Sequence, residues 1–229
     1  MKKNEKEETK AVVKKIKIVN ILIVLLLLYI IGFYTYKVVV APINNIFVVG
    51  NKYLTDQEII DIAGVRNYPS FILTTKYNMK KKLLKNDLID KVKIKKSFGR
   101  ILTIEVEESS PLFIYNDKVI LSNIKQIDNK NYKLPTITNY VEEDILNKLI
   151  EKYQNVDDEI KIMISEIEYV PNDIDKERFI ITMNDGNYVY ITLYKITSIN
   201  EYIKIVSTLD NKKGILYLDS GNYFETLND

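Results

Sequence analysis

A run of 19 residues without a charged side chain, Ile18 to Tyr36, constrains this chain most strongly. As an α-helix the run covers roughly 28 Å at about 1.5 Å per residue, which is close to the hydrocarbon thickness of a bilayer. Four aromatic residues crowd its far end, as is typical of the aromatic belt at a membrane interface. The run therefore predicts a helix that spans a membrane, with the bilayer contacted through Ile18 to Tyr36.

A cleaved signal peptide is the alternative reading of this run. Its hydrophobic region would usually hold 7–15 residues and end in a small-x-small cleavage site. Here the run is longer, and the nearest such site, Val39-Val40-Ala41, is followed by Pro42. Length and site both favour an uncleaved anchor.

The distribution of lysine predicts the orientation of this anchor. The first 17 residues hold seven lysines and three glutamates, whereas only Lys37 and Lys52 are basic in the next twenty residues after Tyr36. The positive-inside rule then places the N-terminus in the cytoplasm and everything after Lys37 outside it. We expect a single-pass protein of the cell membrane whose bulk is extracytoplasmic.

Composition excludes several kinds of active site. The chain has no Cys and no His, which removes the usual zinc sites, Cys or His nucleophile–base pairs and Ser-His-Asp triads. Ser122-Asn123-Ile124-Lys125 fits the Ser-x-x-Lys of penicillin-binding enzymes, but no Lys-Thr-Gly companion is present. The acidic clusters lack the spacing of a calcium loop. We predict no catalytic, cofactor-binding or metal residues, no nucleic acid, no small-molecule substrate and no enzymatic activity.

The first exported segment is predicted as strand, helix, helix, strand, strand. A β-branched strand covers Ile43 to Val49, and Thr55 with Glu58 forms a capping box that begins a helix, which Gly64 ends. A second helix is expected from Tyr77 to Lys85. Alternation then predicts a hairpin with Leu102, Ile104 and Val106 on its buried face.

The second segment begins at Pro111 and is predicted to be richer in strands. Asn116-Asp117 and Asn184-Asp185-Gly186-Asn187 are hairpin signals, the second read as a type I′ turn. The remaining expected elements are helices at 141–153 and 199–209 and strands at 112–115, 119–121, 160–169, 179–183, 188–193 and 215–218.

Charge differs between the two segments. Lys37 to Glu108 holds 13 basic and 8 acidic residues, and Ser109 to Asp229 holds 13 basic and 20 acidic residues. The basic surface of the first segment is either a solvated face or a surface attracted to anionic lipid headgroups or wall polymers.

The order of these parts resembles the FtsQ/DivIB family of bacterial cell-division proteins. The resemblance rests on the ordered set of Val48 to Thr55 with the capped helix, Phe71-Ile72, Lys91 to Phe98, Leu102 to Glu108 with Pro111, Leu134-Pro135, Gly214 to Asp219 and Asn222 to Phe224. It implies an α+β fold: a transmembrane helix, a POTRA domain (β-α-α-β-β), and a mixed antiparallel β domain with flanking helices. The implied boundaries are 1–17 for a cytoplasmic tail, 18–38 for the transmembrane helix, 39–110 for the POTRA domain, 111–225 for the β domain and 226–229 for a short tail.

The resemblance also implies a function. Such a protein is a non-enzymatic scaffold at the division septum that recruits or stabilises coiled-coil division proteins of the FtsL and FtsB/DivIC type, and so helps control septal peptidoglycan synthesis. The alternative is a POTRA-containing export or chaperone module of the cell envelope. No series of ten-residue alternating strands follows the first segment, as an outer-membrane barrel would require.

The expected partner site lies on the C-terminal strand. Ile215 to Leu218 is short and apolar, and one of its edges is expected to lack a sequence-adjacent neighbour, so it could accept a strand from another protein. Family members bind their coiled-coil partner in this region, which implies the residues Gly214, Ile215, Leu216, Tyr217, Leu218, Asn222, Tyr223 and Phe224. The alternative is that Tyr217 and Phe224 only close the domain's own core.

The orientation can be tested by proteolysis. Protease added to intact spheroplasts should digest the chain beyond Lys37 and leave a membrane-embedded N-terminal fragment, because the lysine excess precedes Ile18. Survival of the whole chain would place the large segment in the cytoplasm.

Overall fold

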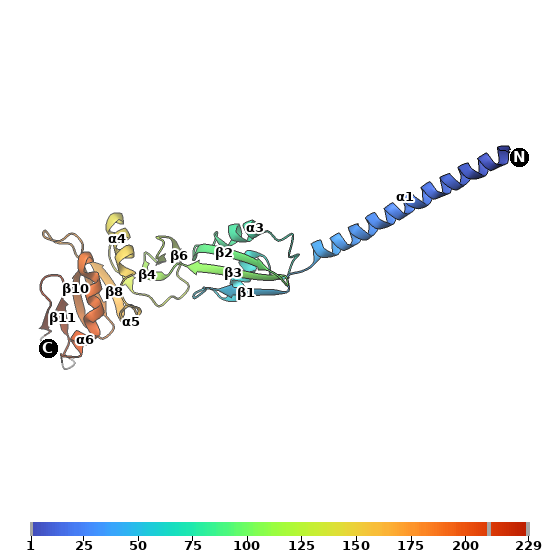
Figure 1. The fold of residues 1–229 in the computed structure, drawn as a ribbon. Helices are drawn as coiled ribbons and strands as arrows, with labels where there is room; N and C mark the ends of the chain where they lie inside the picture. The colour runs from blue at the N-terminus through green and yellow to red at the C-terminus, as the bar shows by residue number, and fades with distance from the viewer. Residues whose placement is uncertain (1, 210–211, 228–229) are drawn as a thin grey trace. The chain divides into compact units, whose positions relative to one another are not determined.

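The computed structural model describes residues 2–209 and 212–227, with side chains from residue 19 onward. It divides into two compact units, the first formed by Met1–Leu83 and Val92–Val106 and the second by Leu84–Lys91 and Glu107–Asp229 (Figure 1). The fold is α+β, as predicted from the sequence.

The first helix, α1, covers Lys2–Val40. Within it, Val19–Val40 has a mean hydropathy of 2.2, and in the described part of the chain it is the one helix long and apolar enough to cross a membrane, by length and composition. The transmembrane helix was predicted at 18–38, and α1 continues beyond it to Val40.

The first unit has the predicted β-α-α-β-β order. After α1 its elements are β1 (Asn45–Val49), α2 (Asp56–Ala63), α3 (Lys76–Leu83), β2 (Ile89–Ser97) and β3 (Ile101–Glu108). The three strands form one sheet in the order β1-β3-β2. Strand β1 runs parallel to β3, with Asn45 opposite Ile101, so the chain enters β1 at the same end of the sheet at which it enters β3.

Local signals in the sequence explain the boundaries of α2. The Thr55 hydroxyl accepts a hydrogen bond from the Glu58 amide, and the Glu58 carboxylate accepts one from the Thr55 amide at 2.8 Å. These bonds satisfy amides that a helix start otherwise leaves without partners. The helix ends at Gly64, which adopts φ 75°, a left-handed conformation that favours glycine.

The second unit holds a nine-stranded sheet. Its elements are β4 (Pro111–Tyr115), β5 (Lys118–Leu121), β6 (Gln126–Asp128), β7 (Thr136–Ile137), α4 (Glu143–Tyr153), α5 (Asp158–Lys161), β8 (Ile164–Tyr169), β9 (Arg178–Met183), β10 (Tyr188–Thr192), η1 (Leu193–Glu201, a 3₁₀ helix), α6 (Tyr202–Val206), β11 (Gly214–Tyr217) and β12 (Tyr223–Thr226). The strand order is β12-β11-β10-β9-β8-β7-β4-β5-β6. The pairs β10–β11, β7–β8 and β4–β7 are parallel, and the others described are antiparallel.

One face of the β8–β11 part of the sheet forms the core of the second unit. Alternate residues of β9 and β10, such as Phe179, Ile181 and Val189, pack in one cluster with Leu149 of α4 and Ile199 of η1. Helices therefore cover this face. In β9 and β10, the residues that alternate with these buried ones point to the opposite face of the sheet.

Two predicted elements differ from the structure. The predicted strand at 160–169 begins only at Ile164, because Ile160 belongs to the short helix α5 and Ile162, which lies between the two elements, is exposed. The predicted helix at 199–209 is also wrong at its start. Buried side chains recur at every third residue from Leu193 through Ile196 and Ile199 to Tyr202, and this period matches a 3₁₀ helix rather than an α-helix.

The two predicted hairpin turns differ from each other in conformation. Asn116 and Asp117 both have positive φ, 49° and 61°, so the β4–β5 connection is the two-residue turn with left-handed residues. In the 184–187 turn only Gly186 has positive φ. The type I′ prediction for that turn is therefore wrong, and the turn is a longer loop with glycine at its left-handed position.

Burial of the first unit's apolar residues leads to a stability prediction. Ile59, Leu83, Ile94 and Ile104 are all buried, as their faces predicted. Replacing Ile104 by Ala should lower the free energy of unfolding by about 2–5 kcal/mol, because Ile104 is fully buried. Denaturant unfolding of a soluble 41–227 fragment measures the loss. The exposed Lys81→Ala change should stay within about 0.5 kcal/mol, and equal effects of the two changes would contradict the packing.

Candidate partner-binding site

Strand β11, which contains the predicted partner residues, lies inside the sheet. It pairs with β10 on one side, Tyr217 opposite Tyr190, and with β12 on the other, Leu216 opposite Phe224. The expectation that Ile215 to Leu218 has an unpaired edge is therefore wrong. The reason is that the chain turns back after Asp219 and adds β12, which the sequence reading did not predict as a strand.

Among the described strands, β12 forms one end of the sheet and β6 forms the other. The Leu227 amide donates to the Lys213 carbonyl at 3.0 Å, so residue 227 has its backbone directed toward β11. Because backbone direction alternates along an antiparallel strand, Phe224 and Thr226 direct their amide and carbonyl groups away from β11. We call these outward backbone groups of Phe224 and Thr226 the open edge.

A row of tyrosines crosses the sheet beside this edge, on the face opposite the core. Tyr190 of β10, Tyr217 of β11 and Tyr223 of β12 are direct cross-strand partners. The Tyr190 and Tyr217 rings stack with centroids 5.1 Å apart, and the Tyr217 and Tyr223 rings with centroids 4.5 Å apart. We call these three residues the aromatic row. Such pairs contribute about 0.5–1.5 kcal/mol beyond their burial, so the row holds β12 to the sheet.

An arginine lies beside the first ring of the aromatic row, that of Tyr190. The Arg178 guanidinium lies 4.0 Å from the centroid of the Tyr190 ring, a distance that permits a cation–π interaction. The same side chain donates to the Asp219 carboxylate at 2.7 Å, and the two side chains are only 19% and 9% exposed. This pair joins β9 to the segment that follows β11.

The surroundings of Asp219 favour the ionised form of its carboxyl group. Burial works against ionisation of Asp219, but hydrogen bonds from Arg178 and Ser220 outweigh it and lower the pKa of the carboxyl. Because the folded-state pKa is lowered, the pair stabilises the fold above the usual Asp range and loses this contribution as the pH falls below that range. At neutral pH the pair is fully ionised.

Gly214 permits the close approach of β12. A Cβ at this position would lie 2.1 Å from the Glu225 carbonyl oxygen and 2.5 Å from the Phe224 ring. Side chains do not tolerate such distances, so any other residue here must displace β12. Gly221, in the connection between β11 and β12, has only an ordinary contact of 3.6 Å to Tyr223.

Asn187, which is fully buried, fixes where β11 begins. Its side-chain oxygen accepts from the Gly214 amide at 2.9 Å. Its side-chain nitrogen donates to the Tyr202 hydroxyl at 2.9 Å and to Asp185, and the Tyr202 hydroxyl donates to Asp185 at 2.7 Å. Burial and then the bond to Asp185 raise the pKa of Tyr202, which keeps its proton on this network. The β9–β10 turn, α6 and β11 are thus joined through one amide.

The eight residues predicted for the site take different positions. Leu216 and Leu218 are buried in the core, and Phe224 packs against it. Ile215, Tyr217 and Tyr223 are the residues that face away from the core, and Asn222 lies in the turn with φ 55°. The alternative for Phe224, that it closes the domain's own core, agrees with its packing. Tyr217 lies on the other face.

Sequence reasoning missed Arg178, Tyr188 and Tyr190, which share that outward face with Tyr217. A signal for them exists, since Tyr188 and Tyr190 alternate with the buried Val189 and Ile191. No local pattern shows that β10 pairs with β11, because the two strands are connected through η1 and α6.

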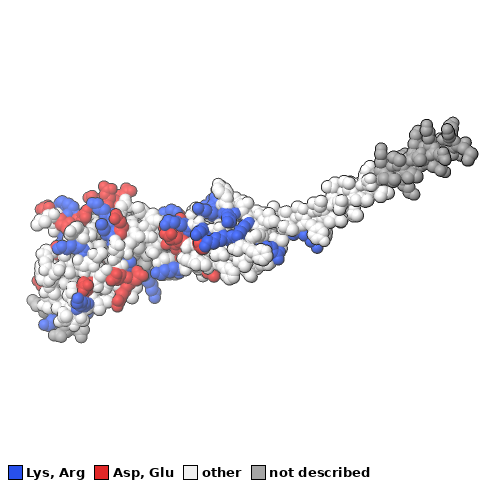
Figure 2. All heavy atoms as spheres, viewed as in Figure 1, with Lys and Arg blue, Asp and Glu red and all other residues white. Residues whose placement is uncertain are grey.

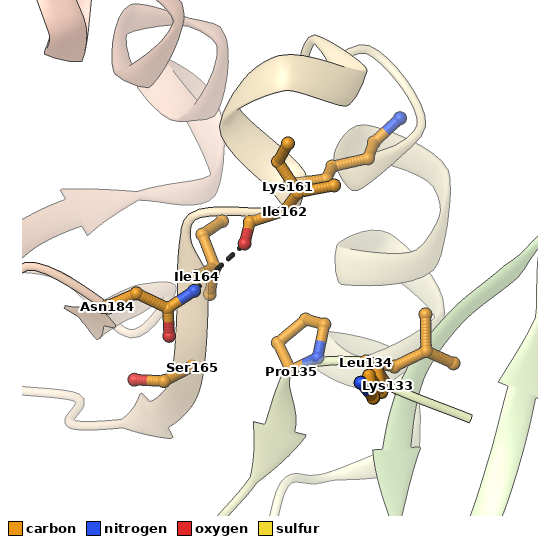
Figure 3. A pocket seen from close by; sticks show the side chains of 8 residues that line it. All are labelled: Lys133, Leu134, Pro135, Lys161, Ile162, Ile164, Ser165 and Asn184. Carbon is orange, nitrogen blue, oxygen red and sulfur yellow. Dashed lines mark hydrogen bonds between the residues drawn. The ribbon is translucent and has the colours of Figure 1, made fainter. Parts of the chain in front are cut away.

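A hollow on the second unit is lined by residues of both polar and apolar type (Figure 3). Its volume is about 550 Å³, and the residues that line it are Lys133, Leu134, Pro135, Lys161, Ile162, Ile164, Ser165 and Asn184. The Asn184 side chain donates to the Ile162 carbonyl at 2.9 Å, and the Lys161 ammonium pairs with Asp158 at 3.2 Å. The lining contains no carboxylate that could act as a general base.

In the Ser-x-x-Lys match, the side chains of the serine and the lysine both bond to other residues. The Ser122 hydroxyl accepts from the Ser110 amide at 3.0 Å, and the Lys125 ammonium pairs with Asp87 at 3.3 Å. Within the described residues no group of three or more acidic side chains could hold a metal ion. The aromatic row beside the open edge is therefore the best-formed candidate site, and it is suited to binding a protein strand.

Comparison with known proteins agrees with this architecture. Residues 41–109 match the family described as "POTRA domain, FtsQ-type". The chain is 28% identical to "Cell division protein DivIB" of Bacillus subtilis over 196 residues, which cover 81% of this chain and 74% of that protein. The resemblance to the FtsQ/DivIB family is confirmed.

Further relatives extend the FtsQ/DivIB likeness along the chain. "Cell division protein DivIB" of Bacillus anthracis is 28% identical over 237 residues, covering 99% of this chain and 88% of that protein. The solved extracytoplasmic domain of the trans isomer of divib from Geobacillus stearothermophilus is 20% identical, with a TM-score of 0.38, over 45% of this chain and 96% of that one.

The close approach of β12 to Gly214 gives a selective test of the candidate site. Gly214→Ala should detach β12, because the new Cβ would overlap the Glu225 carbonyl. Amide hydrogen exchange at residues 223–227 should become faster while exchange in β9 and β10 stays slow. Gly221→Ala is the matched control and should leave both unchanged. Equal protection of residues 223–227 in the two variants would show that β12 does not depend on Gly214.

Proposed function

We propose that this protein is a non-enzymatic, single-pass scaffold of the bacterial division machinery. The similarity to proteins named as cell-division proteins and the match to the FtsQ-type POTRA domain support a role in division. The helix segment Val19–Val40 is long enough for the anchor, and the lysine excess before it supports a cytoplasmic N-terminus. The proposed domains are the POTRA domain at 39–110 and the β domain at 111–225.

The partner is bound, in this proposal, by addition of a strand to β12. The observation that carries it is the open edge of Phe224 and Thr226, which lies beside the aromatic row. Backbone hydrogen bonds to the open edge would supply affinity, and the outward side chains of the row would supply specificity. Tyr223, 51% exposed, extends this surface to the last described strand. Tyrosine contributes strongly to such interfaces because it buries a large area at a small entropy cost.

The partners we propose are coiled-coil division proteins of the FtsL and FtsB/DivIC type at the septum. Their recruitment would let the scaffold influence septal peptidoglycan synthesis. An export module would instead be distributed over the whole cell envelope, so midcell fluorescence of a tagged chain in dividing cells separates the two functions.

A proline at the open edge tests this mode of binding. Thr226→Pro removes the outward amide of residue 226, while the bonds of β12 to β11 come from the neighbouring residues. Capture of the extracytoplasmic segment of an FtsB/DivIC-type partner should weaken about tenfold or more, since a lost backbone bond and the proline ring both oppose strand addition.

Thr226→Val is the matched control, because it keeps the amide and the β-branched shape. Its affinity should remain within about threefold of the parent. Circular dichroism should show both variants folded. If the proline variant is folded and captures the partner as well as the parent does, the partner binds elsewhere.

A further inference from the structure

Three segments of the first unit meet at one end of its sheet. The first contains residues 39–44, in which α1 ends and the chain enters β1. The others are the loop 69–77 before and into α3 and the turn 97–100 between β2 and β3. We call this group the α1-side end. Figure 2 shows Lys and Arg gathered over the part of the first unit that carries α3, the helix into which the loop 69–77 leads.

Hydrogen bonds tie the loop 69–77 to the end of α1. The Ser70 hydroxyl donates to the Val39 carbonyl at 2.6 Å, and the Phe71 amide donates to the Ala41 carbonyl at 2.9 Å. Pro42 and Ser70 also form a β-bridge. The loop is therefore attached to the last turn of the helix.

The turn 97–100 is attached to the same segment from the other side. The Asn44 amide donates to the Arg100 carbonyl, and the Asn44 side chain donates to the Gly99 carbonyl, both at 2.9 Å. The Lys96 ammonium ties the loop 69–77 to the end of β2 that leads into the turn 97–100, since it donates to the carbonyls of Phe71 and Thr74. It also lies 4.8 Å from the centroid of the Phe71 ring.

Large apolar side chains project from both loops into solvent. Ile72 is 48% exposed, Leu73 64%, Tyr77 72%, and Phe98 is fully exposed. A single exposed apolar residue needs no explanation. Here four of them come from two loops that are both bonded to the same short segment. Basic residues accompany them, with Lys76 beside Tyr77 and Arg100 close to Phe98.

Distances place these side chains within reach of a membrane interface. The 22 residues of Val19–Val40 cover about 33 Å, enough for a hydrocarbon core of about 30 Å, so Val39 lies at its boundary if α1 crosses the bilayer. Ile72 follows Ser70 by two residues, at most about 7 Å of chain. This is comparable with the headgroup layer on each side of a bilayer, which is about 5–8 Å thick.

We propose that the α1-side end docks onto the leaflet from which α1 emerges, with Ile72, Leu73 and Phe98 in the interface and Lys76 and Arg100 beside anionic headgroups. The inference rests on the proposed function in one respect, namely that α1 crosses the membrane. Apolar and aromatic side chains flanked by basic ones suit this layer. Each basic residue close to an anionic surface strengthens the attraction to it. The domain would then be held by its surface as well as by its tether.

The chain has no tryptophan, so a single introduced one reports its own surroundings. The test uses the full chain with Leu73→Trp or Phe98→Trp, reconstituted into phosphatidylcholine–phosphatidylglycerol vesicles whose acyl chains carry bromine as a quencher. Ile174→Trp is the control, because Ile174 is also almost fully exposed but belongs to the second unit. Emission from positions 73 and 98 should move to shorter wavelength and be quenched, and emission from position 174 should do neither.

Flotation of the vesicles separates failure of the docking from failure of the anchor. A chain that floats with the vesicles but shows no more quenching at 73 and 98 than at 174 overturns the docking alone. A chain that does not float overturns both the anchor and the docking. In phosphatidylcholine alone, quenching at 73 and 98 should fall, because the basic residues lose their headgroup partners. Unchanged quenching would overturn the role of Lys76 and Arg100.

Discussion

One buried amide, Asn187, determines where the last strands of the second unit lie. Its side chain accepts from the amide of Gly214 and donates to Tyr202 and Asp185. Each of these partners is in a different element. Loss of the side-chain amide would leave the buried Gly214 amide without this bond, at a cost of about 1–3 kcal/mol, whereas Tyr202 and Asp185 would remain bonded to each other. The position of β11 in turn determines that of β12, and therefore of the open edge and the aromatic row.

Lys96 has a comparable role in the first unit, although its chemistry is different. Its ammonium donates to two carbonyls of the loop 69–77 and faces an aromatic ring. Burial, followed by repulsion from Lys76, lowers the pKa of Lys96, which shows that the contact is made at some electrostatic cost. Both units thus use one polar side chain at or next to the end of a strand to hold a neighbouring loop or strand in place. In neither case would substitution by an apolar residue supply the missing bonds.

Local sequence patterns predicted the first unit almost completely. The capping box at Thr55, the glycine at position 64 and the alternation around Ile104 each act within a few residues, so the sequence alone shows them. For the candidate site, Tyr217 and Tyr223 were named as partner-binding residues, which stays a prediction; both lie in the aromatic row. The strand β11 was taken for the edge, but β12 lies beyond it. Three features depend on contacts between segments distant in sequence, for which no short pattern exists. They are the parallel pairing of β10 with β11, the 3₁₀ period of η1 and the return of the chain to form β12.

The placement of β12 has a consequence for the time at which the binding surface is completed. Chains are synthesised from the N-terminus, and their domains form in that order. Of the described strands, β11 and β12 are made last, and β11 pairs with β10 only after η1 and α6 have been made. In the proposed mode of binding, a partner can add only after β10, β11 and β12 have all been made and paired. The proposed binding surface therefore forms later than the first unit, whose described strands all precede β4 in the chain.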